Sequence, residues 1–102
     1  MFIDKRILGT FISQKRRKAG VSQAFLARKL GYKTAQYISN WERGASVPPL
    51  RKMRPLSTVL KIPVKELISA IVNATEDQLR SELLQKFKIK KLKKRLSGNT
   101  TY

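Results

Sequence analysis

The chain carries many basic side chains and few groups suited to catalysis. Its 102 residues include 23 Lys and Arg, 6 Asp and Glu, and no Cys or His, which gives a net charge of +17. Without Cys and His it lacks thiolates, the commonest general base and the commonest metal ligand. The six carboxylates are scattered along the sequence, and no GxxxxGK phosphate-binding loop occurs. We therefore expect no enzymatic activity, no metal and no cofactor.

This excess of positive charge indicates a polyanionic partner, nucleic acid first and an anionic membrane second. The charge is densest in residues 86–95, where seven basic residues occur without an acid: Lys86, Lys88, Lys90, Lys91, Lys93, Lys94 and Arg95. We interpret them as an arm that adds nonspecific DNA affinity. Two alternatives stay open. The segment docks on the domain or a partner chain through Leu79, Leu83 and Phe87, or it lies on a membrane, which the absence of Trp there disfavours.

Helices are the elements expected to position these side chains. A hydrophobic fraction of 41% is enough for a core, and the apolar residues recur with helical period and never alternate with period two. The expected helices cover residues 4–18, 22–30, 34–43, 49–60 and 64–73, and a sixth begins at the capping box Thr75-Glu76-Asp77-Gln78. This pattern predicts an all-α fold. It comprises a five-helix domain over residues 1–73 and a basic helical extension over residues 74–102, with a disordered end.

Single residues refine these elements. Asp4 and Ser22 can cap the first two helices, and Gly20, Gly31 and Gly44 fall where three successive helices end. Gly9 suggests close packing inside the first helix, and Pro55 should kink or split the fourth. The apolar residues expected on the inner faces of these two helices are Ile7, Leu8, Phe11, Ile12, Leu50, Met53, Leu56, Val59 and Leu60.

Residues 22–43 combine two short helices, a Gly at the turn and a Gly at the end, a pattern typical of a helix-turn-helix. The spacing of Ser22-Gln23, Leu26-Ala27, Leu30-Gly31 and the run from Ile38 to Gly44 resembles the lambda-repressor and Cro family of DNA-binding domains, the xenobiotic-response-element family. The resemblance extends from about Leu8 to Ile71. The stretch from Gly31 to Trp41 is one residue longer than in the family, with Tyr32 or Lys33 as the additional position.

The resemblance implies that helix 34–43 lies in the major groove. Ala35, Gln36 and Asn40 match base-contacting positions, where an amide can pair bidentately with adenine and an Ala can touch a thymine methyl group. The alternative is that both amides are ordinary exposed side chains. Phosphate contacts are expected from the following residues: Gln23, Lys33, Thr34, Tyr37 and Arg43.

Three further residues are expected to support the recognition helix. Arg16 and Glu42 occupy positions that form an ion pair in the family, which would brace this helix against the first one. Trp41 lies at helical spacing from Ile38, so we expect it in the core rather than stacked on a base.

The predicted function is sequence-specific transcriptional regulation on double-stranded DNA, with homodimer formation through Ile68, Ile71 and Val72 and an alternative protein partner on the C-terminal helix. Two rival functions are a nucleoid-type architectural protein of low specificity and an antitoxin-like interaction module. The longest apolar runs at the N-terminus span two or three residues, too few for a signal peptide, so the expected location is the cytoplasm and the nucleoid.

Overall fold

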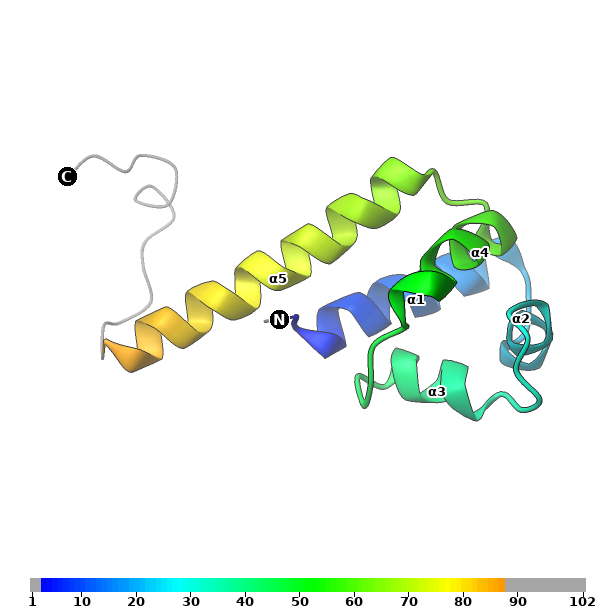
Figure 1. The fold of residues 1–102 in the computed structure, drawn as a ribbon, viewed down its shortest axis with the longest axis horizontal. Coiled ribbons are helices and arrows are strands. Elements are labelled where there is room, and N and C mark those ends of the chain that lie inside the picture. The colour runs from blue at the N-terminus through cyan, green and yellow to red at the C-terminus, as the bar shows by residue number, and fades with distance from the viewer. Residues whose placement is uncertain (1–2, 88–102) are drawn as a thin grey trace.

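Five helices form the computed structural model, which describes residues 3–87 (Figure 1). They are α1 (Lys5–Ala19), α2 (Gln23–Lys29), α3 (Gln36–Glu42), α4 (Leu50–Leu60) and α5 (Val64–Lys86), and no strand occurs within residues 3–87. The predicted all-α, five-helix fold is therefore confirmed. Helix α1 packs against α3, α4 and α5, and α5 projects beyond the other helices.

Local signals in the sequence define the ends of the first two helices. The Asp4 carboxylate accepts hydrogen bonds from the backbone N–H groups of Arg6 and Ile7, at 3.0 and 3.1 Å. Gly20 ends α1 with a φ of 73°, a left-handed conformation that a residue without Cβ adopts at little cost. The Ser22 hydroxyl accepts from the N–H of Phe25 at 3.0 Å and caps α2. Because these caps use neighbouring residues, the sequence predicts them well.

Gly9 lies where α1 and α3 approach each other most closely. A Cβ atom at this position would overlap the carbonyl oxygen of Trp41 and lie 2.9 Å from that of Glu42. These are backbone atoms near the end of α3, so they can yield only if the two helices separate. The close packing that Gly9 suggested is therefore present, and it sets the distance between α1 and α3.

The core lies between α1 and the helices that surround it. Twelve apolar side chains are buried: Leu8, Ile12, Leu26, Ala27, Leu30, Ile38, Trp41, Leu56, Leu60, Ile62, Leu67 and Ala74. Two residues expected on inner faces are instead exposed, Ile7 at the start of α1 and Leu50 at the start of α4. Each lies in the first turn of its helix, near the edge of the bundle. Ser57 of α4, which was not expected in the core, is buried, and its hydroxyl donates to the carbonyl oxygen of Ile62.

Pro55 does not divide α4, which runs unbroken from Leu50 to Leu60. The residue whose carbonyl would have bonded to the absent N–H is Arg51, one turn earlier and exposed to solvent. Water can reach this side of the helix, so the absence of one hydrogen bond does not end it. Of the two effects expected of Pro55, a kink or a split, the split does not occur.

The separate sixth helix predicted from Thr75 is also wrong, because α5 continues through this position to Lys86. Thr75 does not cap a helix. Its hydroxyl donates to the carbonyl oxygen of Ile71 at 2.8 Å, as a Thr inside a helix does. No Gly or Pro interrupts residues 64–86. Ala74 is fully buried and its carbonyl accepts from the N–H of Asp4 at 3.2 Å, so the start of the chain is fixed to the middle of α5.

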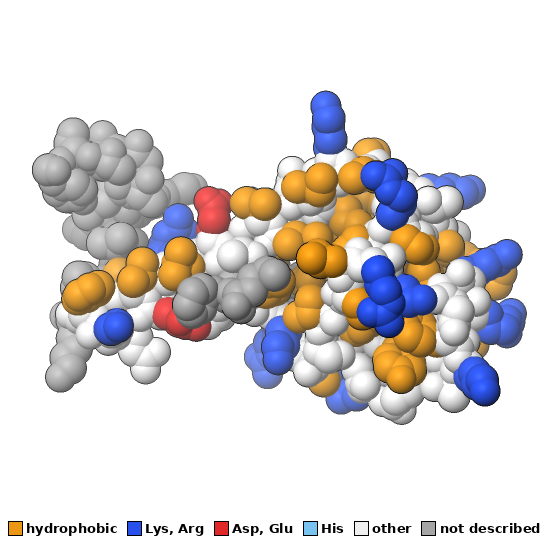
Figure 2. All heavy atoms as spheres, in the orientation of Figure 1, with side chains coloured by type: hydrophobic (Ala, Val, Ile, Leu, Met, Phe, Trp, Pro, Cys, Tyr) orange, Lys and Arg blue, Asp and Glu red, His pale blue; other side chains and the backbone are white. Residues whose placement is uncertain are grey.

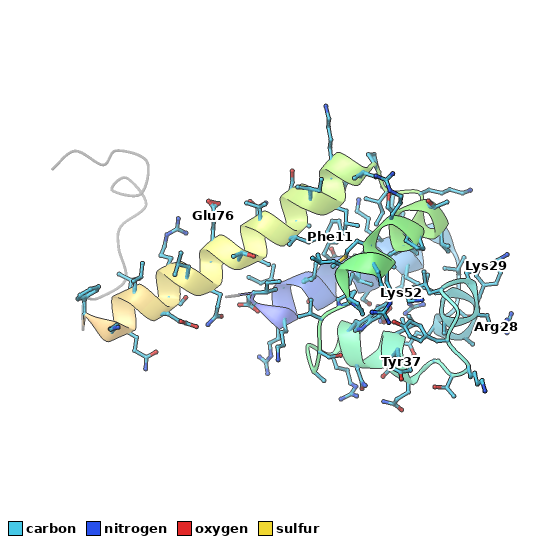
Figure 3. The ribbon with its side chains drawn as sticks, in the orientation of Figure 1. Phe11, Arg28, Lys29, Tyr37, Lys52 and Glu76 are labelled. Carbon is cyan, nitrogen blue, oxygen red and sulfur yellow. The ribbon has the colours of Figure 1, made fainter. Side chains whose placement is uncertain are left out.

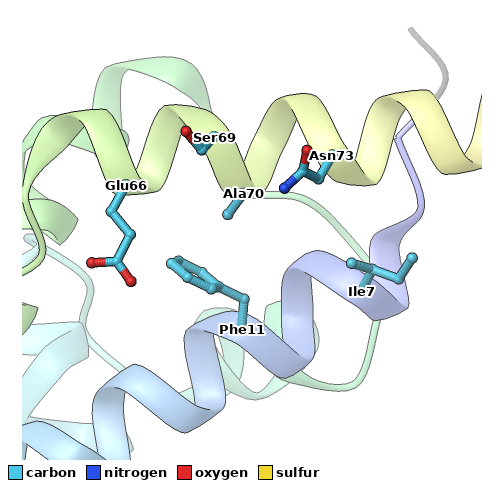
Figure 4. Close-up of a pocket in the computed structure, with 6 residues that line it drawn as sticks. All are labelled: Ile7, Phe11, Glu66, Ser69, Ala70 and Asn73. Carbon is cyan, nitrogen blue, oxygen red and sulfur yellow. The ribbon is translucent and has the colours of Figure 1, made fainter. Parts of the chain in front are cut away.

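A shallow groove of about 270 Å³ lies between α1 and α5 (Figure 4). Its walls are Ile7 and Phe11 from α1 and Glu66, Ser69, Ala70 and Asn73 from α5. The carboxylate of Glu66 forms an ion pair with Lys15, whose ammonium also lies 5.5 Å from the centre of the Phe11 ring. The groove is thus mainly apolar, and the acid on its rim is already paired.

Replacement of Gly9 by Ala should reveal the close approach through the sign of its effect. At an open helix position Ala is more favourable than Gly by about 0.5–1 kcal/mol. Here the added methyl group must push α3 away, so we expect the free energy of unfolding to fall by about 1–3 kcal/mol. Chemical denaturation measures the change.

Thr10→Ala is the matched control, because Thr10 is the exposed neighbour of Gly9 in α1. Its effect should stay within about 0.5 kcal/mol of zero. A Gly9→Ala variant that is more stable than the natural chain would contradict the packing described for α1 and α3.

Candidate nucleic-acid interface

Helix α3 has a buried side and an exposed side. Ile38 and Trp41 are 0% and 2% exposed and anchor the helix in the core. Gln36 and Tyr37 are exposed, and Asn40 is half-buried. The helix begins at Gln36, two residues later than expected, and residues 34–35 belong to the turn before it. The polar side chains that we assigned to base contacts lie on the outer side.

A row of hydrogen-bonded polar side chains runs along the outside of α3. The amide nitrogen of Gln36 donates to the Asn40 carbonyl oxygen at 2.9 Å. The guanidinium of Arg43 donates to the same Asn40 oxygen and also to the Ser39 hydroxyl, at 3.3 Å for the latter. Residues three and four positions apart share a helix face, which explains the spacing. The structure thus brings together two predicted base contacts and one predicted phosphate contact.

This row leaves a definite set of hydrogen-bonding groups for a ligand. The Asn40 side-chain oxygen accepts two hydrogen bonds, so its two lone pairs are used. Within residues 3–87 no hydrogen bond involves the side-chain N–H groups of Asn40 or the side-chain oxygen of Gln36. Asn40 can therefore donate outward, while Gln36 offers one acceptor and one remaining donor.

An ion pair braces α3 from behind. The Arg16 Nε lies 2.6 Å from Glu42 Oε2, and its Nη2 donates to Oε1 at 3.1 Å, a bidentate arrangement. Arg16 also donates to the carbonyl oxygen of Val21 at 2.9 Å. The two charged side chains are 12% and 7% exposed, so water screens the pair only weakly. The structure places Arg16 and Glu42 where the family pattern implied, linking α1, α3 and the turn before α2.

Gln23 joins the same cluster. Its amide nitrogen donates to Glu42 Oε1 at 2.9 Å, and the residue is half-buried at the start of α2. The side chain expected on a phosphate is therefore held by Glu42 through one of its N–H groups. The second N–H and the amide oxygen remain to meet a ligand.

The other predicted contact residues surround the start of α3. Lys33 and Thr34 are exposed in the turn, and the Thr34 hydroxyl accepts from the N–H of Gln36 at 3.3 Å. Ala35 is the half-buried residue before α3 and provides no side-chain cap. Tyr37 is 52% exposed on the outer side of the helix (Figure 3). These side chains thus lie in the turn directly before Gln36 or in the first turn of α3.

An aromatic cluster that the sequence analysis did not identify holds this region. The ring of Tyr32, in the turn between α2 and α3, stacks on Tyr37 with centroids 4.2 Å apart and an interplanar angle of 19°. It also meets Trp41 edge to face at 5.7 Å. Because Ala35 at the N-cap position makes no side-chain hydrogen bond, the packing of Tyr32 on Tyr37 is a tertiary restraint on the first turn of α3.

Lys52 of α4 completes the cluster (Figure 3). Its ammonium lies 4.9 Å from the centre of the Tyr32 ring and donates to the carbonyl oxygen of Leu30 at 2.6 Å. A cation is favoured at this carbonyl because it belongs to the C-terminal end of α2. The sequence analysis did not identify Lys52, because the chain contains many other Lys residues. The one signal in the sequence is its position four residues before Leu56, which places it on the same side of α4 as this core residue.

Most of the predicted basic arm lies outside the described residues. Lys86 is the last residue of α5 and is exposed. The remaining six positions are beyond residue 87: Lys88, Lys90, Lys91, Lys93, Lys94 and Arg95.

No group of three or more Asp and Glu side chains within residues 3–87 could hold a metal ion. Within the same part of the chain, no helix is long and apolar enough to cross a membrane.

Comparison with known proteins agrees with this geometry. Residues 12–67, more than half of the chain, match the family model for helix-turn-helix domains of the Cro and lambda-repressor type. The matched region begins at the buried Ile12 of α1 and ends at the buried Leu67 of α5, and it includes α2, α3 and α4. No curated protein matches the chain.

Replacement of Lys52 by Met should loosen the start of α3. Met keeps most of the aliphatic stem but removes the charge and the donor to Leu30. A hydrogen bond from a charged group contributes about 1.5–3 kcal/mol, and we expect the free energy of unfolding to fall by an amount near the lower end of this range. Amide hydrogen exchange should accelerate at residues 32–37, measured by NMR on the protein without DNA.

Arg51→Met is the matched control, since it removes the same charge from an exposed neighbour in α4. It should leave exchange at residues 32–37 unchanged. Equal effects of the two variants would mean that Lys52 acts through net charge and not through its contacts with the turn.

Proposed function

Because this chain belongs to the helix-turn-helix family of the lambda-repressor and Cro type, a family of DNA-binding regulators, we propose that it is a sequence-specific transcriptional regulator that places α3 in the major groove. The observation that carries the proposal is the hydrogen-bonded row of Gln36, Asn40 and Arg43 on the outer side of α3. Side chains that are already ordered lose less conformational entropy when they meet a base pair.

The groups left by this row suggest how bases are read. Gln36 offers an acceptor and a donor, the pair that matches N6 and N7 of adenine. Asn40 offers donors alone while its oxygen is bound by Gln36 and Arg43, which suits acceptors such as N7 or O6 of a purine. Ala35 would contact a thymine methyl group.

Phosphate contacts would fix the register of the protein on the duplex without specifying sequence. We assign them to the basic and polar residues around α3 and at the start of α2: Gln23, Lys33, Thr34, Tyr37 and Arg43. Support comes from their exposure or partial exposure at the start of α2, in the turn before α3 and at the two ends of α3. The C-terminal Lys and Arg residues would add affinity that is independent of sequence.

Homodimer formation is part of the same proposal. Two copies would bind half-sites about 34 Å apart on a palindrome. Ile68 and Val72 are 53% and 48% exposed on α5 and can meet a second copy, whereas Ile71 is half-buried against the core. Action on DNA would place the protein in the cytoplasm, associated with the nucleoid.

A second candidate function is an architectural DNA-binding protein of low specificity. The net charge of +17 favours it, because only one of the basic residues lies in the row on α3. The two functions differ in the ratio of specific to nonspecific affinity at physiological salt.

Substitution of Gln36 or Asn40 by Ala tests base reading. A duplex selected from a random pool by the natural protein serves as the cognate site. Loss of either side chain should reduce the preference for this site over a shuffled duplex by about 1–3 kcal/mol. Affinity for the shuffled duplex should stay nearly constant, because neither residue neutralises phosphate. Fluorescence anisotropy titrations measure both affinities.

Gln14→Ala is the control, because it removes the same amide from an exposed position on α1. It should change neither affinity. Equal weakening on cognate and shuffled DNA by the α3 variants would refute base reading, and a natural protein with no selectable site would favour the architectural function.

Neutralisation of the C-terminal arm tests its contribution separately. Residues 88–95 contain six Lys and Arg and no acid, and all six are replaced by Gln in one variant. If they neutralise phosphates, affinity falls on every duplex, and the slope of log K against log salt decreases in magnitude by about 0.9 for each phosphate that the variant no longer neutralises. The preference for the cognate site should survive. An unchanged salt slope would show that the arm does not bind DNA.

A further inference from the structure

The end of α3 carries an arginine that has no acidic partner in the part of the chain that the structure describes. Within residues 3–87 no ion pair involves Arg43. The carboxylate of the neighbouring Glu42 is occupied by Arg16 and Gln23. On the face shown in Figure 2, the acidic side chains lie along α5, while basic side chains lie mainly over the bundle. The guanidinium of Arg43 therefore bonds to neutral acceptors on its own helix.

Two hydrogen bonds hold the Arg43 side chain on the outer side of α3. Its Nε donates to the Ser39 hydroxyl at 3.3 Å, and its Nη2 donates to the side-chain oxygen of Asn40. Asn40 is half-buried, and its backbone carbonyl accepts from the N–H groups of Ala45 and Ser46, at 2.8 and 3.3 Å. The loop after α3 thus fixes the backbone of Asn40, which leaves the orientation of its side-chain amide to be set by Arg43.

Arg43 dictates this orientation because its chemistry allows one solution. A guanidinium carries N–H donors and no acceptor, so the Asn40 atom that faces it must be the oxygen. The other neighbour, Gln36, has an amide that can donate or accept after a half-turn. Gln36 donates to the same oxygen at 2.9 Å, which is the role that the orientation set by Arg43 leaves to it. The N–H groups of Asn40 remain for a ligand.

An asparagine fixed in this way distinguishes guanine from adenine. In the major groove guanine presents two neighbouring acceptors, N7 and O6, whereas adenine presents the acceptor N7 beside the donor N6. The bidentate pair with adenine requires the amide oxygen to accept from N6, and in Asn40 this oxygen is already bound. An N–H group would face the N6 donor without forming a hydrogen bond. Held by Arg43, Asn40 therefore favours guanine.

We propose that Arg43 is a positioning residue that makes Asn40 a reader of guanine. This role rests on the proposed placement of α3 in the major groove, and it adds the base that one position of the site must contain. Arg43 acts through the Asn40 amide and does not itself touch this base. The guanidinium forms no other hydrogen bond within residues 3–87, so its remaining N–H groups stay available for the phosphate contact proposed above.

Affinities for all single-base variants of the selected duplex test this role. Asn40→Ala first identifies the base pair that Asn40 reads, as the pair at which the preference of the natural protein disappears. The natural protein should prefer guanine there. Arg43→Met removes the donors, so the Asn40 amide can turn, accept from N6 and donate to N7. The preference at this pair should change from guanine to adenine, with a change of about tenfold or more in the ratio of the two affinities.

Arg51→Met is the matched control, because it makes the same replacement at an exposed position on α4. It should keep the guanine preference. Arg43 is itself exposed, so its replacement should leave the fold intact. A lost phosphate contact weakens all duplexes alike and does not change the ratio of guanine to adenine. A natural protein that prefers another base at this pair would overturn the proposal, as would an Arg43→Met variant that retains guanine or loses all preference there.

Failure of the proposed function gives a different result. A natural protein with no selectable duplex would refute the regulator, and with it the role of Arg43. A selectable duplex without guanine at the pair read by Asn40 would refute the role of Arg43 and leave the regulator standing.

Discussion

The contact between Gly9 of α1 and the last turn of α3 determines how α3 is held against the rest of the bundle. Because Gly9 lacks a Cβ, the carbonyl groups of Trp41 and Glu42 can lie directly against α1. This distance brings the Trp41 ring into the core and places the Glu42 carboxylate within reach of Arg16. A larger residue at position 9 would weaken both anchors together, because each requires the same separation of the two helices.

Two of the six acids then connect α1 to its neighbours. Glu42 of α3 pairs with Arg16, and Glu66 of α5 pairs with Lys15, the adjacent residue of α1. In a chain of net charge +17, an acid placed between two helices offsets repulsion among the many basic groups. The described bundle has no buried side-chain nitrogen or oxygen atom without a hydrogen-bond partner. Its polar contacts therefore orient the helices without leaving a buried group unsatisfied.

The sequence predicted features that depend on neighbouring residues better than those that depend on distant ones. Caps at Asp4 and Ser22 and the end of α1 at Gly20 follow from local chemistry. The helix break at Thr75 was wrong because a capping-box pattern cannot show that α5 already continues through it. The aromatic cluster was missed because Tyr32, Tyr37, Trp41 and Lys52 come together only once three elements pack. Similarly, the spacing of Gln36 and Asn40 indicated a shared face, but their hydrogen bond and its effect on the available donors required the structure.

The polar row on α3 has a consequence for how this protein can diverge. Gln36, Asn40 and Arg43 bond to one another and to Ser39, and none of these bonds reaches the core. Mutations in the row can therefore accumulate without a large loss of folding stability, while Ile38 and Trp41 on the other side of the same helix tolerate little change. Under the proposed base reading, gene duplicates can acquire new operators through a few substitutions at the outer positions of this seven-residue helix.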